Sequence, residues 1–146
     1  IRPASPRDGK ATVRVIPGEA LGARAVIDTH TPIVFQDWTL AAGADASVSL
    51  ESGETALVYV FGGVARVGDA GTEVRDGQLA ILGEGNLVRL RADEPARLLP
   101  LAGTPLREPV ARYGPFVMNT RQELVQAFDD FESGRMGEIT RTARAA

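Results

Sequence analysis

Few side chains in this sequence can bind a metal or attack a substrate, and their scarcity limits the chemistry of the chain. There is no cysteine and a single histidine, His30. Thiolate sites need cysteine, and histidine-built metal sites usually take two or more imidazoles from one chain. The sequence therefore excludes a disulfide scaffold, a thiolate zinc site and a cysteine nucleophile. His30 lies between two threonines, and we predict a surface or edge-strand position for it.

Acidic residues are the remaining candidates, because burial can raise the pKa of a carboxyl group and make it a general acid. Glu51 and Glu54 have no evident polar partner, which favours a solvated barrel rim. Asp129, Asp130 and Glu132 fall on the polar side of a predicted helix and are expected to face solvent. We therefore predict no catalytic residue in this chain.

Length and composition describe one ordinary globular domain. The 146 residues are 44% hydrophobic and 24% charged. A chain of this length and composition can form a hydrophobic core without disulfides or a structural metal. The formal net charge of −3 lacks the basic footprint of a nucleic-acid-binding protein. The longest apolar run, 56–61, is far shorter than the roughly 20 residues of a membrane span, and no secretory leader is evident. We expect a cytoplasmic protein with no direct nucleic-acid or membrane partner.

Residues 12–101 show the pattern of a protein built from short strands. Many short β-branched or alternating segments separated by glycine turns are typical of a β-sandwich or a closed barrel. The run Gly83-Glu84-Gly85 lacks the lysine of a phosphate-binding loop, so we interpret it as a hairpin turn. The predicted strands cover residues 12–16, 25–40 with a break at Pro32, 47–50, 56–61, 64–67, 78–82, 87–90 and 96–101.

A helix follows an extended, proline-rich connection. Thr120 and Glu123 have the spacing of a capping box, and Ser133-Gly134 supplies a stop signal. Between them an apolar stripe at helical spacing needs a surface to dock on, and we expect the barrel to provide it. The stripe consists of Leu124, Ala127, Phe128 and Phe131.

Two glycine spacings resemble the cupin family of small β-barrels. The first cupin motif is glycine, five residues, His-x-His, three or four residues, glutamate, six residues and glycine. Here it reads Gly43, five residues, Ser49-Leu50-Glu51, three residues, Thr55, six residues and Gly62. The second motif, glycine, five residues, Pro-x-Gly, two residues, His, three residues and Asn, reads Gly77, five residues, Gly83-Glu84-Gly85, two residues, Val88, three residues and Ala92.

The glycines of both motifs fit, whereas the metal ligands fit at neither. The ligand positions are held by Ser49, Glu51, Thr55 and Val88. Only Glu51 could bind a metal, and a catalytic divalent site needs about three protein ligands. The resemblance therefore predicts a barrel without a metal.

Strand alternation leaves the register of this region open. If Ser49 and Glu51 face inward, their neighbours Val48 and Leu50 face outward and cover a second domain; the alternative is a register shifted by one residue. The apolar side chains of the connection before the helix either anchor it on the barrel or join the barrel to a neighbour. Candidate interface residues are therefore Val48, Leu50, Tyr113, Phe116, Met118, Phe128 and Phe131.

The C-terminal part of the chain resembles the closing segment of pirins. Residues 106–139, LREPVARYGPFVMNTRQELVQAFDDFESGRMGEI, contain the Glu-Pro pair, the YGPFVMNT string and the Gly-Arg helix end of that family. Residues 15–40 are similar to the start of the same pirin half. One departure is Glu51-Ser52-Gly53-Glu54, where pirins tend to carry Pro-x-Gly-His.

The resemblance implies one domain over residues 12–139, an all-β double-stranded β-helix (jelly-roll) barrel of the cupin type with one C-terminal α-helix. A linker or frayed terminus at 1–11 and a loose tail at 140–146 flank it. Pirins are bicupins, and this sequence corresponds to their C-terminal barrel, which usually lacks a metal. Iron or another divalent metal is implied for an N-terminal half only, so we expect no cofactor in this chain.

Three functions follow from the resemblance and the residues. In the first, the chain is a metal-free half with a structural and protein-binding role. Its partner is then a metal-binding N-terminal cupin, a second copy in a homodimer or a regulatory protein. Alternatively, it is part of an iron-dependent dioxygenase of the quercetin 2,3-dioxygenase type, whose active site lies in the N-terminal half. The third alternative is a free-standing barrel that binds a small apolar ligand.

Overall fold

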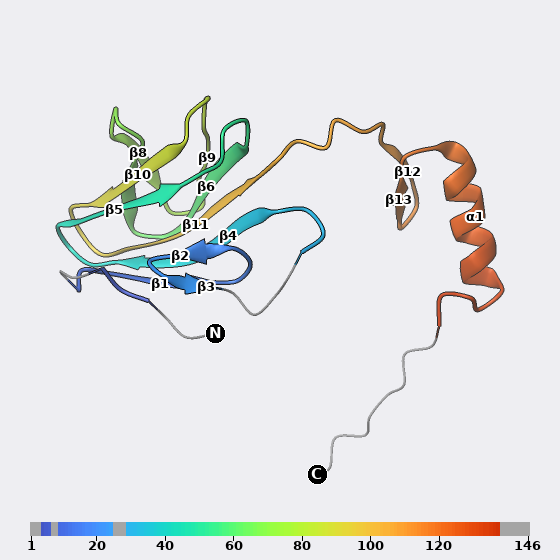
Figure 1. The fold of residues 1–146 in the computed structure, drawn as a ribbon, viewed down its shortest axis with the longest axis horizontal. Coiled ribbons are helices and arrows are strands. Elements are labelled where there is room, and N and C mark those ends of the chain that lie inside the picture. Colours follow the sequence, from blue (N-terminus) through green and yellow to red (C-terminus); the bar gives the residue numbers. More distant parts are fainter. Residues whose placement is uncertain (1–3, 7–8, 25–28, 138–146) are drawn as a thin grey trace, which may run out of the picture. The chain divides into compact units, whose positions relative to one another are not determined.

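The computed structural model describes residues 4–6, 9–24 and 29–137 (Figure 1). The predicted tail at 140–146 and the start of the predicted strand at 25–28 lie outside the described residues. Ala4, in the predicted terminal segment 1–11, forms an antiparallel bridge with Val13, and its N–H donates to the Val13 carbonyl at 2.8 Å. The contacts divide the chain into two compact units, residues 1–105 and 106–146.

The first unit consists of two antiparallel sheets. Among the described residues, the larger sheet has five strands in the order β1 (Ala11–Val15), β4 (Ile33–Leu40), β11 (Ala96–Gly103), β6 (Thr55–Gly62) and β9 (Leu79–Ile81). The smaller has four, in the order β5 (Ala44–Ser49), β10 (Leu87–Ala92), β7 (Val64–Val67) and β8 (Thr72–Arg75). A short pair, β2 (Glu19–Ala20) and β3 (Ala23–Arg24), accompanies them. Neighbours within each sheet are mostly distant in sequence, as in a jelly roll, and the predicted all-β class is confirmed.

Strict alternation of side chains builds the core of this unit. In β6, Val58 and Val60 are buried, whereas the alternate residues Leu57 and Tyr59 are half-exposed. The same two-residue period runs through β11 and β4, so one face of each strand contributes to a shared apolar cluster. The largest side chains of that cluster are Trp38, Leu40, Leu90 and Leu98.

Gln36 is the one buried polar side chain among the described residues, and both ends of its amide are hydrogen-bonded. Its Nε2 donates to the Glu19 carbonyl at 3.1 Å, and its Oε1 accepts from Trp38 Nε1 at 2.8 Å. An unpaired buried amide would cost about 1–3 kcal/mol. The two bonds offset that cost and fix the orientation of the indole ring.

The interpretation of Gly83-Glu84-Gly85 as a hairpin turn is wrong. A hairpin joins two strands that pair with each other, but β9 pairs with β6, and β10 pairs with β5 and β7. The loop therefore leads from the larger sheet to the smaller one. Glycine-rich composition is the same for both kinds of connection, so it does not distinguish a hairpin turn from a loop between two sheets.

The second unit contains a hairpin and a helix. Strands β12 (Ala111–Tyr113) and β13 (Phe116–Met118) pair in register and turn at Gly114, where φ is +54°. The sequence predicted an unpaired extended connection here, and this prediction is wrong for these two strands. Within the described ranges, no helix is both long and apolar enough to cross a membrane.

The predicted helix is confirmed as α1 (Arg121–Glu132). The capping box is complete: the Glu123 N–H donates to Thr120 Oγ1 at 3.2 Å, and the Thr120 N–H donates to Glu123 Oε2 at 2.8 Å. Ser133 ends the helix, and Gly134 follows with a φ of +72°. The apolar stripe of α1 contacts β12 and β13 of its own unit.

Candidate functional site

The cupin ligand positions do not form a metal site in this structure. Ser49, Glu51 and Thr55 are exposed, and Val88 is buried in the core. Val48 is 3% exposed and Leu50 packs partly buried against the core, so the register is shifted by one residue, the second of the two alternatives above. The prediction of Val48 as an interface residue is wrong, because its side chain belongs to the core.

The positions that do face inward carry apolar side chains. Counting four residues instead of three after Glu51, the other spacing of the first motif, places Ala56 at the glutamate position and Gly63 at the closing glycine. Ala56 is buried, like Val48 and Val88. None of these side chains can donate an electron pair to a divalent metal, so they do not fit the metal of the fold family. No three His, Asp or Glu side chains of the described residues gather as a metal site.

The other sequence candidates lie apart from one another. His30 is exposed. Glu54 Oε2 accepts a hydrogen bond from the Glu51 N–H at 2.8 Å, so this pair closes the turn between β5 and β6 at the rim. Asp129 and Glu132 on α1 are exposed, as predicted.

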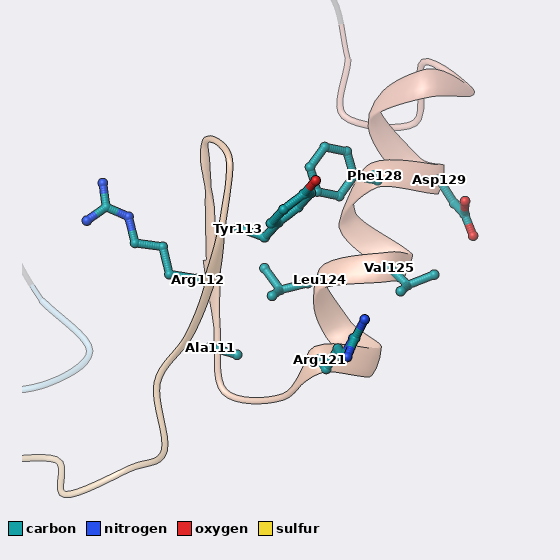
Figure 2. Close-up of a pocket in the computed structure, with 8 residues that line it drawn as sticks. All are labelled: Ala111, Arg112, Tyr113, Arg121, Leu124, Val125, Phe128 and Asp129. Atoms are coloured by element: carbon teal, nitrogen blue, oxygen red, sulfur yellow. The ribbon is translucent and has the colours of Figure 1, made fainter.

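A groove in the second unit is the strongest candidate for a functional surface. It lies between β12 and α1 and has a volume of about 630 Å³ (Figure 2). We call it the hairpin–helix groove. It is lined by Ala111, Arg112, Tyr113, Arg121, Leu124, Val125, Phe128 and Asp129.

Aromatic side chains form one wall of the groove. The Phe128 ring meets the rings of Tyr113 and Phe116 edge-to-face, at centroid distances of 5.7 and 4.9 Å. Phe131 lies 6.2 Å from Phe116 in a similar geometry. Each such pair contributes about 0.5–1.5 kcal/mol of stability beyond that from burying its apolar area. The structure therefore brings these four predicted interface residues together, with Met118 half-buried on β13.

Charged side chains border the apolar floor. Arg121 lies at the first turn of α1 and Asp129 at its third, while Arg112 extends from β12 away from the helix (Figure 2). Neither arginine forms an ion pair with a described residue. An apolar centre with a charged rim is the usual composition of a protein contact surface. Ala111 and Arg112 were not expected from the sequence, because the hairpin that places them beside the helix has no signal of its own in the sequence.

Acid is expected to weaken the start of α1. Hydrogen bonds from Thr120 hold the pKa of Glu123 below the usual range of a glutamate, with a further one from the Asn119 N–H. The ionised carboxylate therefore stabilises the folded unit above the usual glutamate pKa, and this stabilisation disappears as the pH falls through the lowered value.

The Glu123→Gln variant keeps an acceptor at this position and cannot titrate, so its helix start should lose this dependence on pH. NMR signals of the Thr120 and Glu123 amides, followed through the acid range, measure it locally. The local readout is needed because Arg135 and Gln126 also lower the pKa of Asp130 near the other end of the helix. Identical titrations of the parent and the variant would contradict the expectation.

Comparisons with known proteins agree with this architecture. Residues 35–137 match the pirin C-terminal cupin domain. Mouse Pirin is 41% identical over 139 residues, which cover 92% of this chain and 48% of Pirin. A Pirin-like protein of Caulobacter vibrioides is 39% identical over 135 residues, 91% of this chain and 48% of its own length.

A solved structure, described as quercetin 2,3-dioxygenase from Acinetobacter baumannii, superimposes with a TM-score of 0.84 at 35% identity. The match covers 95% of this chain and 48% of that one, and the chain spans about half the length of the curated relatives it matches. The jelly roll of the first unit is thus a cupin barrel, and the chain belongs to the pirin family, within which it corresponds to the C-terminal cupin domain.

Proposed function

We propose that this chain is the metal-free C-terminal half of a two-barrel pirin protein, with a structural and protein-binding role beside a metal-binding N-terminal cupin. The observation that carries the proposal is the apolar character of the inward positions Val48, Ala56 and Val88. A barrel without donors at these positions supplies a rigid body and a surface instead of a reactive centre. The expected cytoplasmic location is part of the proposal.

The protein-binding role is assigned to the hairpin–helix groove. Val125 and Tyr113 on its walls are largely exposed, although both are apolar or aromatic. When a partner covers exposed apolar surface of this kind, the surface is removed from water, and this favours the complex. The partner proposed is the N-terminal cupin; a second copy and a regulatory protein are the alternative partners.

Metal analysis of the chain tests the proposal. The purified chain is incubated with Fe²⁺, Ni²⁺ or Zn²⁺, passed through a desalting column and measured by elemental analysis, with a metal-binding cupin as positive control. We expect far less than one ion per chain for each metal, because the inward positions offer no ligand set. Tight, stoichiometric binding of any of the three would contradict the proposal.

A second function is favoured by the structural match to the protein described as quercetin 2,3-dioxygenase. In this version the chain is one half of a dioxygenase whose iron is held by the other half. Turnover of quercetin, measured with the two-barrel protein and with this chain alone, tests it. Activity of the two-barrel protein without activity of the chain supports this version, whereas activity of the chain alone would contradict both versions.

A further inference from the structure

Strand β9 is an edge of the five-stranded sheet and carries two exposed apolar side chains. It lies beside β6, and no other strand of the described residues pairs with it (Figure 1). Ile81 is 75% exposed and Leu79 is 52% exposed, whereas Ala80 between them packs against the core. The unpaired edge of such a strand is a template for pairing with another chain, and proteins normally cover it or place charges on it.

The other edge strands of the two described sheets have that protection. β1 contains Arg14 and is bridged along its outer edge by residue 4. β5 contains Asp45, and β8 contains Glu73 and Arg75. The sequence of β9, Leu-Ala-Ile, has neither a charged residue nor a proline. Among these edges, β9 is therefore the one that is best suited to pair with a further strand.

The outward backbone groups of β9 belong to Leu79 and Ile81. In an antiparallel pair, successive residues direct their N–H and C=O groups alternately toward the partner strand and away from it. The Gln78 carbonyl and the Leu82 N–H are each hydrogen-bonded to β6 at 3.0 Å, so the even-numbered positions face that strand. The N–H and C=O groups of Leu79 and Ile81 therefore point away from β6, along the open edge.

This edge is complementary to itself. When two copies of β9 pair antiparallel about Ala80, Leu79 of each copy lies opposite Ile81 of the other. The two residues of each such pair exchange both of their N–H···O=C bonds, and their apolar side chains lie on the same side of the joined sheet. Ala80 then lies opposite Ala80, where the Cα atoms approach to about 4.5 Å, and a small side chain permits that approach.

We propose that β9 pairs with β9 of a second copy of this chain and joins the two five-stranded sheets into one across a two-fold axis. The interface is isologous, so it closes at a dimer instead of growing into a filament. Strands of three residues span only roughly 10 Å, far less than the contact of a stable complex. We therefore expect a weak dimer, with a dissociation constant of about 0.1–1 mM. The contact involves the first unit, whereas the proposed function concerns the groove of the second.

The variants Ile81→Pro and Ile81→Val form a matched pair for testing the inference. Both shorten the exposed side chain, but only proline lacks the outward N–H, and edge strands tolerate proline at such positions. Sedimentation equilibrium of this chain at up to about 1 mM should show a dimer for the parent and for Ile81→Val. Ile81→Pro should raise the dissociation constant at least about tenfold. Equal melting temperatures of the two variants in dilute solution verify that both are folded.

Hydrogen exchange of the parent chain gives a second measurement that needs no variant. The amides of Leu79 and Ile81 should exchange more slowly as the chain concentration rises toward about 1 mM, because they become bonded to the second copy. The amides of β8, an edge strand that carries charges, serve as the internal control and should exchange at a constant rate.

A parent chain that remains monomeric at about 1 mM would overturn the inference, as would a proline variant that dimerises like the valine variant or an assembly larger than a dimer. A dimer that is dissociated by Val125→Asp and retained by Ile81→Pro would identify the hairpin–helix groove as the interface instead. In the two-barrel protein, slow exchange of Leu79 and Ile81 at every concentration would identify the upstream half as the occupant of the edge, which also contradicts the inference.

Discussion

Replacing Trp38 with alanine is expected to lower the free energy of unfolding of the barrel by about 3–5 kcal/mol. The Trp38 side chain is fully buried between Val13 and Leu98, its cross-strand partners on β1 and β11. The substitution leaves a large cavity and also removes the donor of Gln36 Oε1. Urea denaturation followed by circular dichroism in the β-sheet region measures the loss.

Trp38→Phe is the matched control for this experiment. Phenylalanine retains most of the buried volume and loses the hydrogen bond to Gln36 with a small part of the packing, so a cost of about 1–2 kcal/mol is expected. An alanine variant no less stable than the phenylalanine variant would contradict the assignment of Trp38 to the centre of the core.

The second large effect is expected for Gly63→Ala, at least about 3 kcal/mol. Gly63 links β6 to β7 with a φ of +72°, a conformation that costs an L-residue about 1–2 kcal/mol. A Cβ atom at this position would lie 2.3 Å from the Pro95 carbonyl oxygen and 3.2 Å from Ala96 Cα. Both neighbours are backbone atoms, so the overlap is relieved only by moving the connection before β11.

Gly77→Ala separates strain from overlap. Gly77 has a similar φ of +78°, but a Cβ atom there would meet nothing within 4 Å. Its substitution should cost only the conformational part, about 1–2 kcal/mol. Chemical denaturation of both variants gives the comparison, and equal losses would show that the contact with Pro95 is relieved at no cost.

The elements with strong local signals were predictable from the sequence. The apolar run at 56–61 in β6, the glycine turns between the strands and the capping box of α1 are each visible within a short stretch of sequence. The family resemblance was equally local, since it rested on strings such as YGPFVMNT. These signals sufficed for the fold class, the helix and the family.

Features that depend on distant residues were not predictable. Strand β8 has one buried residue, Val74, and β12 and β13 are three residues each, so none of them shows a period. The register that buries Val48 is set by pairing with β10, where Val48 lies opposite Val88. The hairpin–helix groove arises only when β12 packs beside α1, and no single segment carries its pattern.

The position of Trp38 has a practical consequence for following the two units. It is the single tryptophan of the chain and lies in the barrel, whereas α1 is the helix among the described residues of the second unit. Indole emission therefore reports on the barrel, and helical ellipticity reports on the hairpin–helix unit. Without any label, the two signals recorded on one sample give a separate unfolding curve for each unit.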